Sequence, residues 1–172
     1  MKKITLVVVL LLAACFSNAQ TILTAGDIAF LGGNSDGVTN ADDNFAFVLL
    51  KDIDAATTII FTDRGWNDVG GFFSVIGDGS FTWTSGAARS AGDIITLTFA
   101  TLAPVSAAFA AIGDQLFAIQ GTLASPIFIA GLTFNNTVTS DDANWDGSAT
   151  TNSTSARPNA LIGNTAVRII DA

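Results

Sequence analysis

The chain has 172 residues, of which 49% are hydrophobic, and a formal net charge of −8 from 15 acidic and 7 basic residues. That charge argues against nucleic acid and anionic lipid as partners and favours cations. The chain contains no histidine, which excludes Ser–His–Asp and Cys–His catalysis and His-ligated zinc sites. Its length and apolar content suit one domain with a substantial core.

The first 19 residues have the three regions of a secretory signal peptide. Two lysines at 2–3 precede an apolar run at 4–14, and small residues at 17–19 follow. The apolar run is shorter than the roughly 20 residues that span a bilayer. We therefore expect cleavage after Ala19 and an exported domain at 20–172. Without the two lysines, five basic residues remain against fifteen aspartates, a formal charge of −10.

A lipoprotein signal is the alternative interpretation of the same segment. The sequence Leu12-Ala13-Ala14-Cys15 fits the lipobox, at which bacterial lipoproteins are cleaved and acylated on the cysteine. We favour simple cleavage because the small-residue site lies just downstream. Both kinds of signal predict a protein that is secreted or held at the cell surface. Cys15 is the only cysteine, so a chain cut after Ala19 has no disulfide and no thiolate metal site.

The remaining composition predicts strands and turns. All fifteen acidic residues are aspartate, glycine occurs 16 times, and Thr, Ile, Val and Phe are abundant, as expected for pleated sheets joined by tight turns. A first strand is expected within 21–30. The densest apolar run, from Asn44 to Trp66, predicts two core strands joined by a turn. Both alternating sets of 45–51 are apolar, which suits a central strand covered on both faces, whereas Ile59 and Phe61 form one buried face of the next strand.

Turn residues and apolar spacing predict the later elements. Gly77-Asp78-Gly79 suits the tight turn of a hairpin between 72–76 and 80–84. Apolar residues at positions 105, 109 and 112 share a helical face, so one short helix is expected near 104–112. Further strands are expected at 93–99, 115–120, 127–134 and 166–170. The sequence stops two residues later, so we expect a shortened copy of a longer domain.

Gly-Asp recurs before several of the expected strands, at 26–27, 92–93 and 113–114. The irregular spacing does not indicate a solenoid or a propeller. We interpret Gly-Asp as a convenient turn before a strand.

Three stretches carry a family resemblance. They are Ala-Gly-Asp-Ile-Ala-Phe at 25–30, Asp-Asp-Asn-Phe-Ala-Phe-Val-Leu-Leu at 42–50 and Thr-Thr-Ile-Ile-Phe-Thr-Asp-Arg-Gly-Trp at 57–66, with fainter matches at 113–121 and 158–161. This pattern resembles an uncharacterised group of secreted bacterial domains that are similar to lamin-tail-like, immunoglobulin-like β-sandwiches. The resemblance implies that the chain folds as a single all-β domain, an antiparallel β-sandwich. It supplies no catalytic residues.

An acidic loop before the apolar run predicts weak calcium binding. Asn34, Asp36, Asn40 and Asp43 follow the spacing of oxygen ligands 3, 5, 9 and 12 of an EF-hand loop, with Gly37 at position 6. Position 1 lacks a carboxylate and a strand is expected after the loop, so a hydrated, turn-rich loop is the alternative. A second acidic loop at 141–147 has the same two interpretations. Calcium is the only cofactor that the sequence suggests.

Enzymatic activity is not expected. The chain has no His and no Tyr, and its mature part has only one Lys, at position 51, so groups that act as bases or nucleophiles near neutral pH are nearly absent. The aspartate pairs at 42–43 and 141–142 point to opposite sides of an extended chain. Glycoside hydrolysis instead needs two carboxyl groups that face one cleft.

The tryptophans suggest one ligand-binding candidate. Trp66 and Trp83 lie in or beside expected strands and are assigned to the core, whereas Trp145 lies in a long polar loop at 135–159 and is the candidate for stacking on a sugar. The sequence thus predicts a secreted or surface-exposed, non-catalytic binding or adhesion module for an extracellular glycan or protein surface. The alternatives are a structural or accessory domain of a surface assembly, whose strand edges pair with another chain, and a calcium-stabilised carbohydrate-binding domain.

Overall fold

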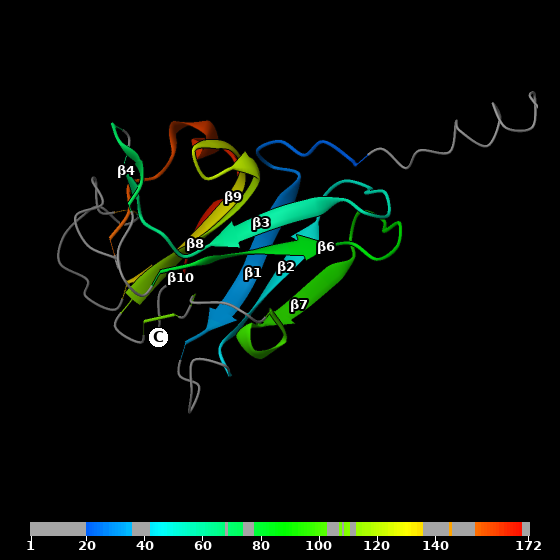
Figure 1. Cartoon of the computed structure of the whole chain (residues 1–172), viewed down its shortest axis with the longest axis horizontal. Coiled ribbons are helices and arrows are strands. Elements are labelled where there is room, and N and C mark those ends of the chain that lie inside the picture. Colours follow the sequence, from blue (N-terminus) through cyan, green and yellow to red (C-terminus); the bar gives the residue numbers. More distant parts are fainter. Residues whose placement is uncertain are drawn as a thin grey trace, which may run out of the picture.

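The computed structural model describes residues 20–35, 42–67, 69–73, 78–102, 107, 109–110, 113–135, 145 and 154–169. In this part of the chain the fold is an all-β sandwich (Figure 1). The elements in chain order are β1 (Ile28–Asn34), β2 (Asn44–Leu49), β3 (Thr58–Thr62), β4 (Trp66–Asn67), β5 (Gly71–Phe72), β6 (Ser80–Thr84), β7 (Ile94–Thr98), the 3-10 helix η1 (Phe99–Leu102), β8 (Gly113–Thr122), β9 (Ser125–Asn135), the 3-10 helix η2 (Asn159–Leu161) and β10 (Ala166–Ile169). No helix among these residues is long and apolar enough to cross a membrane.

Two sheets form the two layers of the sandwich. One has three strands in the order β1-β2-β7, the other has five in the order β10-β9-β8-β3-β6, and β4 and β5 form a separate two-stranded ribbon. All pairings are antiparallel except that of β10 with β9, which is parallel. The expected all-β, antiparallel sandwich is therefore confirmed at the level of architecture.

Phenylalanine rings fill the space between the two sheets. Phe45 and Phe47 of β2 face Phe61 of β3, with ring centroids 5.0 and 5.3 Å apart. Each of these rings is fully buried, and aromatic contacts at such distances add to the free energy of burial. The assignment of the apolar run to the core is confirmed, but its two strands lie in opposite sheets. They do not form a hairpin.

A second apolar cluster covers the outer face of the five-stranded sheet. It contains Phe117, Ile119, Phe128, Trp145 and Leu161. Because β8 contributes alternate residues to this cluster and to the main core, its first eight residues are all buried. The strand covered on both faces is thus β8. The prediction that both faces of β2 are buried is wrong, because the residues on its outward face are only half-buried.

Three other expectations need correction. The strand at 80–84 exists but pairs with β3, while Phe72 pairs with Trp66 in the β4–β5 ribbon, so the predicted 72–84 hairpin is wrong. The first strand begins at Ile28, later than expected. The described residues within 104–112 are not helical, and the nearest helical turn is η1. The rest of that segment lies outside the described residues.

The Gly-Asp turns open the two outer strands of the three-stranded sheet. In the turns at 24–27 and 90–93, glycine has a φ of +96°, a left-handed value that favours glycine. The closing aspartate, Asp27 or Asp93, accepts a hydrogen bond from the backbone N–H three residues earlier, at 2.8 and 3.3 Å. The next residue starts β1 or β7, so the interpretation of Gly-Asp as a strand entry is confirmed.

Candidate functional site

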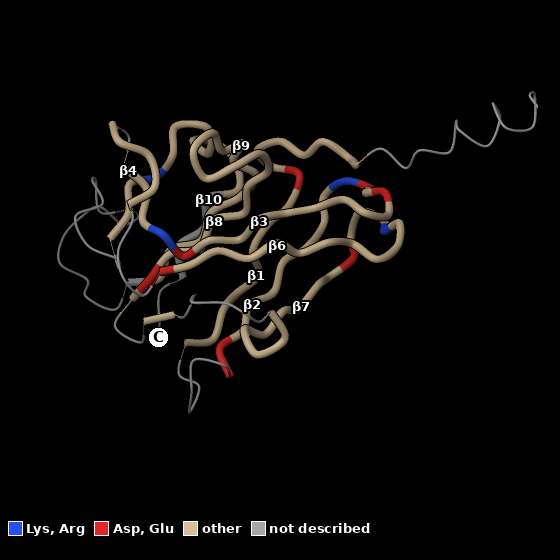
Figure 2. The backbone as a smooth tube through the Cα atoms, in the orientation of Figure 1, with Lys and Arg blue, Asp and Glu red and all other residues tan. Residues whose placement is uncertain are grey.

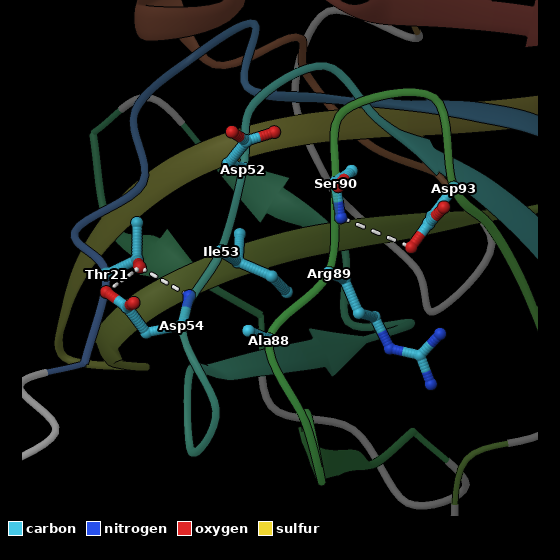
Figure 3. A pocket seen from close by; sticks show the side chains of 8 residues that line it. All are labelled: Thr21, Asp52, Ile53, Asp54, Ala88, Arg89, Ser90 and Asp93. Carbon is cyan, nitrogen blue, oxygen red and sulfur yellow. Dashed lines mark hydrogen bonds between the residues drawn. The ribbon is translucent and has the colours of Figure 1, made fainter.

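A polar groove lies at one end of the sandwich, where two strand connections meet. Ile53, between β2 and β3, and Arg89, between β6 and β7, exchange backbone hydrogen bonds of 2.9 Å in both directions. The groove has a volume of about 520 Å³ and is shown in Figure 3. Its lining consists of Thr21, Asp52, Ile53, Asp54, Ala88, Arg89, Ser90 and Asp93.

Each carboxylate in the groove has one oxygen held by the scaffold. Asp52 Oδ1 accepts a hydrogen bond from the backbone N–H of residue 91 at 2.8 Å, and Asp93 Oδ2 accepts one from that of Ser90 at 3.3 Å. Asp54 Oδ2 accepts a hydrogen bond from the hydroxyl of Thr21 at 2.9 Å. The second oxygen of each carboxylate has no partner within the described part of the chain. The groove therefore holds three oriented hydrogen-bond acceptors.

Arg89 gives the groove a basic side. None of the described residues accepts a hydrogen bond from its guanidinium, and its Nε is shielded from solvent. In Figure 3 the side chain extends away from Asp52 and Asp54 and passes below Asp93. Figure 3 thus places Asp93 and the Arg89 guanidinium on one side of the groove and Asp52 and Asp54 on the other, and none of the lining residues is aromatic.

Charged residues gather at the ends of the sandwich, while the strands between them are almost free of charge (Figure 2). At the other end of β3, Asp63, Asp78 and Asp114 form a second group with Arg64, which we call the carboxylate cluster. Asp63 Oδ1 accepts a hydrogen bond of 2.7 Å from the backbone N–H of residue 79. Asp114 accepts hydrogen bonds from two backbone N–H groups, at positions 110 and 115, both at 2.8 Å.

Burial shifts the pKa values of this cluster. Burial raises the pKa of Asp114 to about 8; the backbone N–H groups of Ala110 and Gln115 oppose the shift, and the charges of Asp63 and Asp78 add to it. Burial also raises the pKa of Asp78 to about 6, against the opposing charge of Arg64. Asp114 is only 5% exposed, and this burial favours its neutral form.

The predicted calcium ligands are only partly described. Asn34 is the last residue of β1 and pairs with Asn44, and Asp43 directly precedes β2, whereas Asp36 and Asn40 lie outside the described residues. Asp43 is 2% exposed; its Oδ2 accepts a hydrogen bond from Phe109 N–H at 3.2 Å, and its backbone oxygen accepts one from Phe99 N–H at 3.0 Å. In the described residues, no group of three or more side chains suited to a metal ion occurs. Calcium binding stays a prediction, and the observed role of Asp43 is to anchor the chain.

Trp145 differs from its prediction. The sequence suggested an exposed indole in a polar loop, but the side chain is 9% exposed and stacks on Phe117, with centroids 5.6 Å apart and an interplanar angle of 26°. The expectation that the indole is exposed and free to stack on a sugar is wrong, because Phe117 already covers one of its faces. Trp66 and Trp83 are half-buried against the two apolar clusters, in line with their assignment to the core.

The groove residues were not recognised as a site in the sequence. They come from the N-terminal segment and two connections about 35 residues apart, which the pairing of β2 with β7 and the bridge between Ile53 and Arg89 bring together. The one local signal was the recurrence of Gly-Asp, which includes Asp93. Comparisons with protein-family models, curated proteins and solved structures found no match.

Proposed function

We propose that the chain is an exported, non-catalytic binding or adhesion module whose partner docks in the polar groove. The observation that carries this proposal is the set of three carboxylates that the scaffold positions, together with the Arg89 guanidinium, whose remaining hydrogen-bonding groups have no partner among the described residues. The signal-like segment and the resemblance to lamin-tail-like exported domains support a location outside the cell or at its surface.

The positions of the titratable groups support a non-catalytic role. A general acid or base needs a pKa near the working pH and access to a substrate. The carboxyl groups with raised pKa values, Asp78 and Asp114, belong to the carboxylate cluster at the other end of β3, away from the groove. We therefore propose that the groove residues bind a partner and do not transfer protons.

The chemistry of the groove favours a protein surface over a neutral glycan. Lysine and arginine side chains make charge-assisted hydrogen bonds with carboxylates, which are roughly twice as strong as those between neutral groups. Sugar rings are held largely by stacking on aromatic side chains, and the groove has none. The formal charge of −10 of residues 20–172, from five basic residues and fifteen aspartates, would also attract a basic partner over distance. We therefore propose a partner surface with a basic side chain that enters between Asp52 and Asp54.

A titration of the isotope-labelled domain 20–172 tests this proposal. The probes are a short lysine- and arginine-containing peptide, the same peptide with glutamine at the basic positions, and a neutral oligosaccharide. We expect the basic peptide alone to shift the backbone resonances of residues 52–54 and 89–93, with weaker binding at higher salt. Asp54→Asn should weaken binding at least fivefold, while Asp42→Asn, an exposed carboxylate outside the groove, should not. Shifts outside the groove, or equal binding by Asp54→Asn, would contradict the proposal.

A second candidate function is a structural role in a surface assembly. The outer face of the three-stranded sheet carries exposed Leu31, Leu50 and Ile94, the last 62% exposed, and Val48 lies half-buried beside Ile94 in the register. Exposed apolar patches often mark contacts with other proteins. Sedimentation velocity over a range of concentrations tests this role. Association that Ile94→Lys abolishes would favour assembly, and a monomer at all concentrations would remove this candidate.

A further inference from the structure

The strand β7 is an open edge of the three-stranded sheet. In the described part of the chain, β2 is the one strand that pairs with β7, and the sheet ends there. Figure 1 shows β7 at the margin of the sandwich. A strand at such an edge presents a row of backbone N–H and C=O groups that can pair with a strand of another molecule.

The register of β7 with β2 identifies these free backbone groups. Backbone hydrogen bonds of 3.0 Å join residue 99 to residue 43 and residue 49 to residue 93, at the two ends of the pair. In an antiparallel pair every second residue bonds to the neighbouring strand, so residues 93, 95, 97 and 99 face β2. The residues whose backbone groups point away from the sheet are therefore Ile94, Thr96 and Thr98.

The other sheet edges differ from β7. Natural proteins protect edge strands with bulges, charged residues or prolines. β1 has a bulge between Phe30 and Gly32, and β10 contains Arg168. β6 has no charge or proline, but its exposed side chains are both threonine. β7 has a regular register, no charge and no proline, and it presents Ile94, which is 62% exposed.

The sequence of β7 suits antiparallel pairing with itself. A two-fold axis at Thr96 places this residue opposite its own copy, and it places Ile94 opposite Thr98 of the second copy. Every outward N–H of one copy then meets an outward C=O of the other, and Ile94 packs against a threonine methyl group.

The charge of the chain also favours this contact between copies. Each copy of residues 20–172 has a formal charge of −10, so two copies repel each other over most of their surfaces. The residues of β7, Ile94–Thr98, are uncharged. Contact through β7 therefore avoids placing carboxylates of the paired strands against one another.

We propose that two copies of the chain associate by antiparallel pairing of their β7 strands, which joins their three-stranded sheets into one continuous sheet. This proposal rests on the second candidate function, the structural role in a surface assembly, and it names the partner and the contact. It does not use the carboxylates of the groove. Its failure would therefore leave the proposal for the groove untouched.

Disulfide trapping tests the register of the pairing. The domain 20–172 contains every described residue and no cysteine, so Thr96→Cys has a single thiol. Opposed residues of a hydrogen-bonded pair have Cα atoms about 5.5 Å apart, which suits a disulfide. In Thr98→Cys the two cysteines would lie about 14 Å apart, four residues along the strands. We expect Thr96→Cys to form a covalent dimer at least tenfold faster on mild oxidation, and equal rates would overturn the proposal.

Sedimentation velocity over a range of concentrations tests the edge without a new thiol. Thr96→Pro removes an N–H that the monomer does not use, at a position where edge strands tolerate proline. It should weaken association at least tenfold. Thr82→Pro makes the same change on β6, where the N–H also points away from the sheet, and should weaken it less than threefold. Salt should strengthen association by screening the repulsion between copies, opposite to its effect on the basic peptide in the groove.

A measurement on the wild type covers the case in which Thr96→Pro does not fold. Amide hydrogen exchange at Thr96 should slow as the protein concentration rises, while exchange at Thr82 stays constant. A monomer at every concentration, or equal slowing at both amides, would overturn the proposal. Association that Ile94→Lys abolishes and a folded Thr96→Pro leaves unchanged would also overturn it, because the contact would then lie on the outer face of the sheet.

Discussion

Truncation of Trp145 to alanine separates the core role seen in the structure from the ligand-binding role that the sequence suggested. The indole is almost fully buried, stacks on Phe117 and lies beside Gly131. Removal of a large buried aromatic side chain costs about 3–5 kcal/mol in the free energy of unfolding. That is a large share of the roughly 5–15 kcal/mol that stabilises a typical domain. We therefore expect a much lower urea midpoint, measured by circular dichroism.

The control for this truncation is Val69→Ala, because Val69 is 98% exposed and its loss should change the free energy of unfolding by less than about 0.5 kcal/mol. A loss below about 1 kcal/mol for Trp145→Ala would refute the assignment of the indole to the core.

The close packing around Trp145 allows an independent check. A Cβ atom at Gly131 would lie 3.1 Å from Trp145 Cη2 and 2.9 Å from Leu161 Cδ1, so Gly131→Ala should overpack the cluster and cost about 1–3 kcal/mol. If the indole occupies this position, the same substitution should cost less in the Trp145→Ala background. Additive effects of the two substitutions would show that Trp145 does not touch Gly131.

Three further substitutions test the scaffold. Phe61→Ala should cost about 3–5 kcal/mol in denaturant unfolding, because the ring is fully buried between the sheets; a cost below about 1 kcal/mol would contradict its central position. Gly121→Ala should cost about 1–3 kcal/mol, since Gly121 has a φ of +83° and a Cβ there would lie 2.6 Å from a backbone oxygen; an unchanged melting temperature would exclude this turn. Burial opposes a low pKa at Asp27, but hydrogen bonds from the backbone at position 24 and from Lys51 lower it. Stability from Asp27 is therefore present above pH 3.8 and lost as pH falls through the lowered value, so Asp27→Asn should reduce the melting temperature at pH 7 but not at pH 2.

Strand positions were predictable because their signals are local. The alternation of Ile59 and Phe61 with polar residues marks β3 within five residues, and Gly-Asp marks the starts of β1 and β7. Strand partners were not predictable in the same way. The connection from β2 to β3 has turn residues that suit a hairpin, yet the chain crosses to the opposite sheet. That choice depends on β8, which pairs with β3 and lies more than 50 residues later.

The candidate site was harder to predict than the fold for the same reason. Asp52 and Asp93 both line the groove because β2 pairs with β7 and Ile53 forms a bridge with Arg89. Trp145 was assigned to an exposed loop because its sequence neighbours are polar, and nothing local indicates the apolar surface that β8 and β9 provide. Burial of a single aromatic residue in a polar segment depends on distant strands.

All acidic residues of the chain are aspartate, and the geometry of turns and loops explains this better than cation binding does. Most described aspartates accept a hydrogen bond from a backbone N–H, namely Asp27, Asp43, Asp52, Asp63, Asp93 and Asp114. The short aspartate side chain reaches such N–H groups at strand ends, and the longer glutamate side chain is less suited to this local bonding. The net charge thus overstates the number of carboxylates that are available to a partner. Those in the groove, whose second oxygen has no partner among the described residues, are the better evidence for binding.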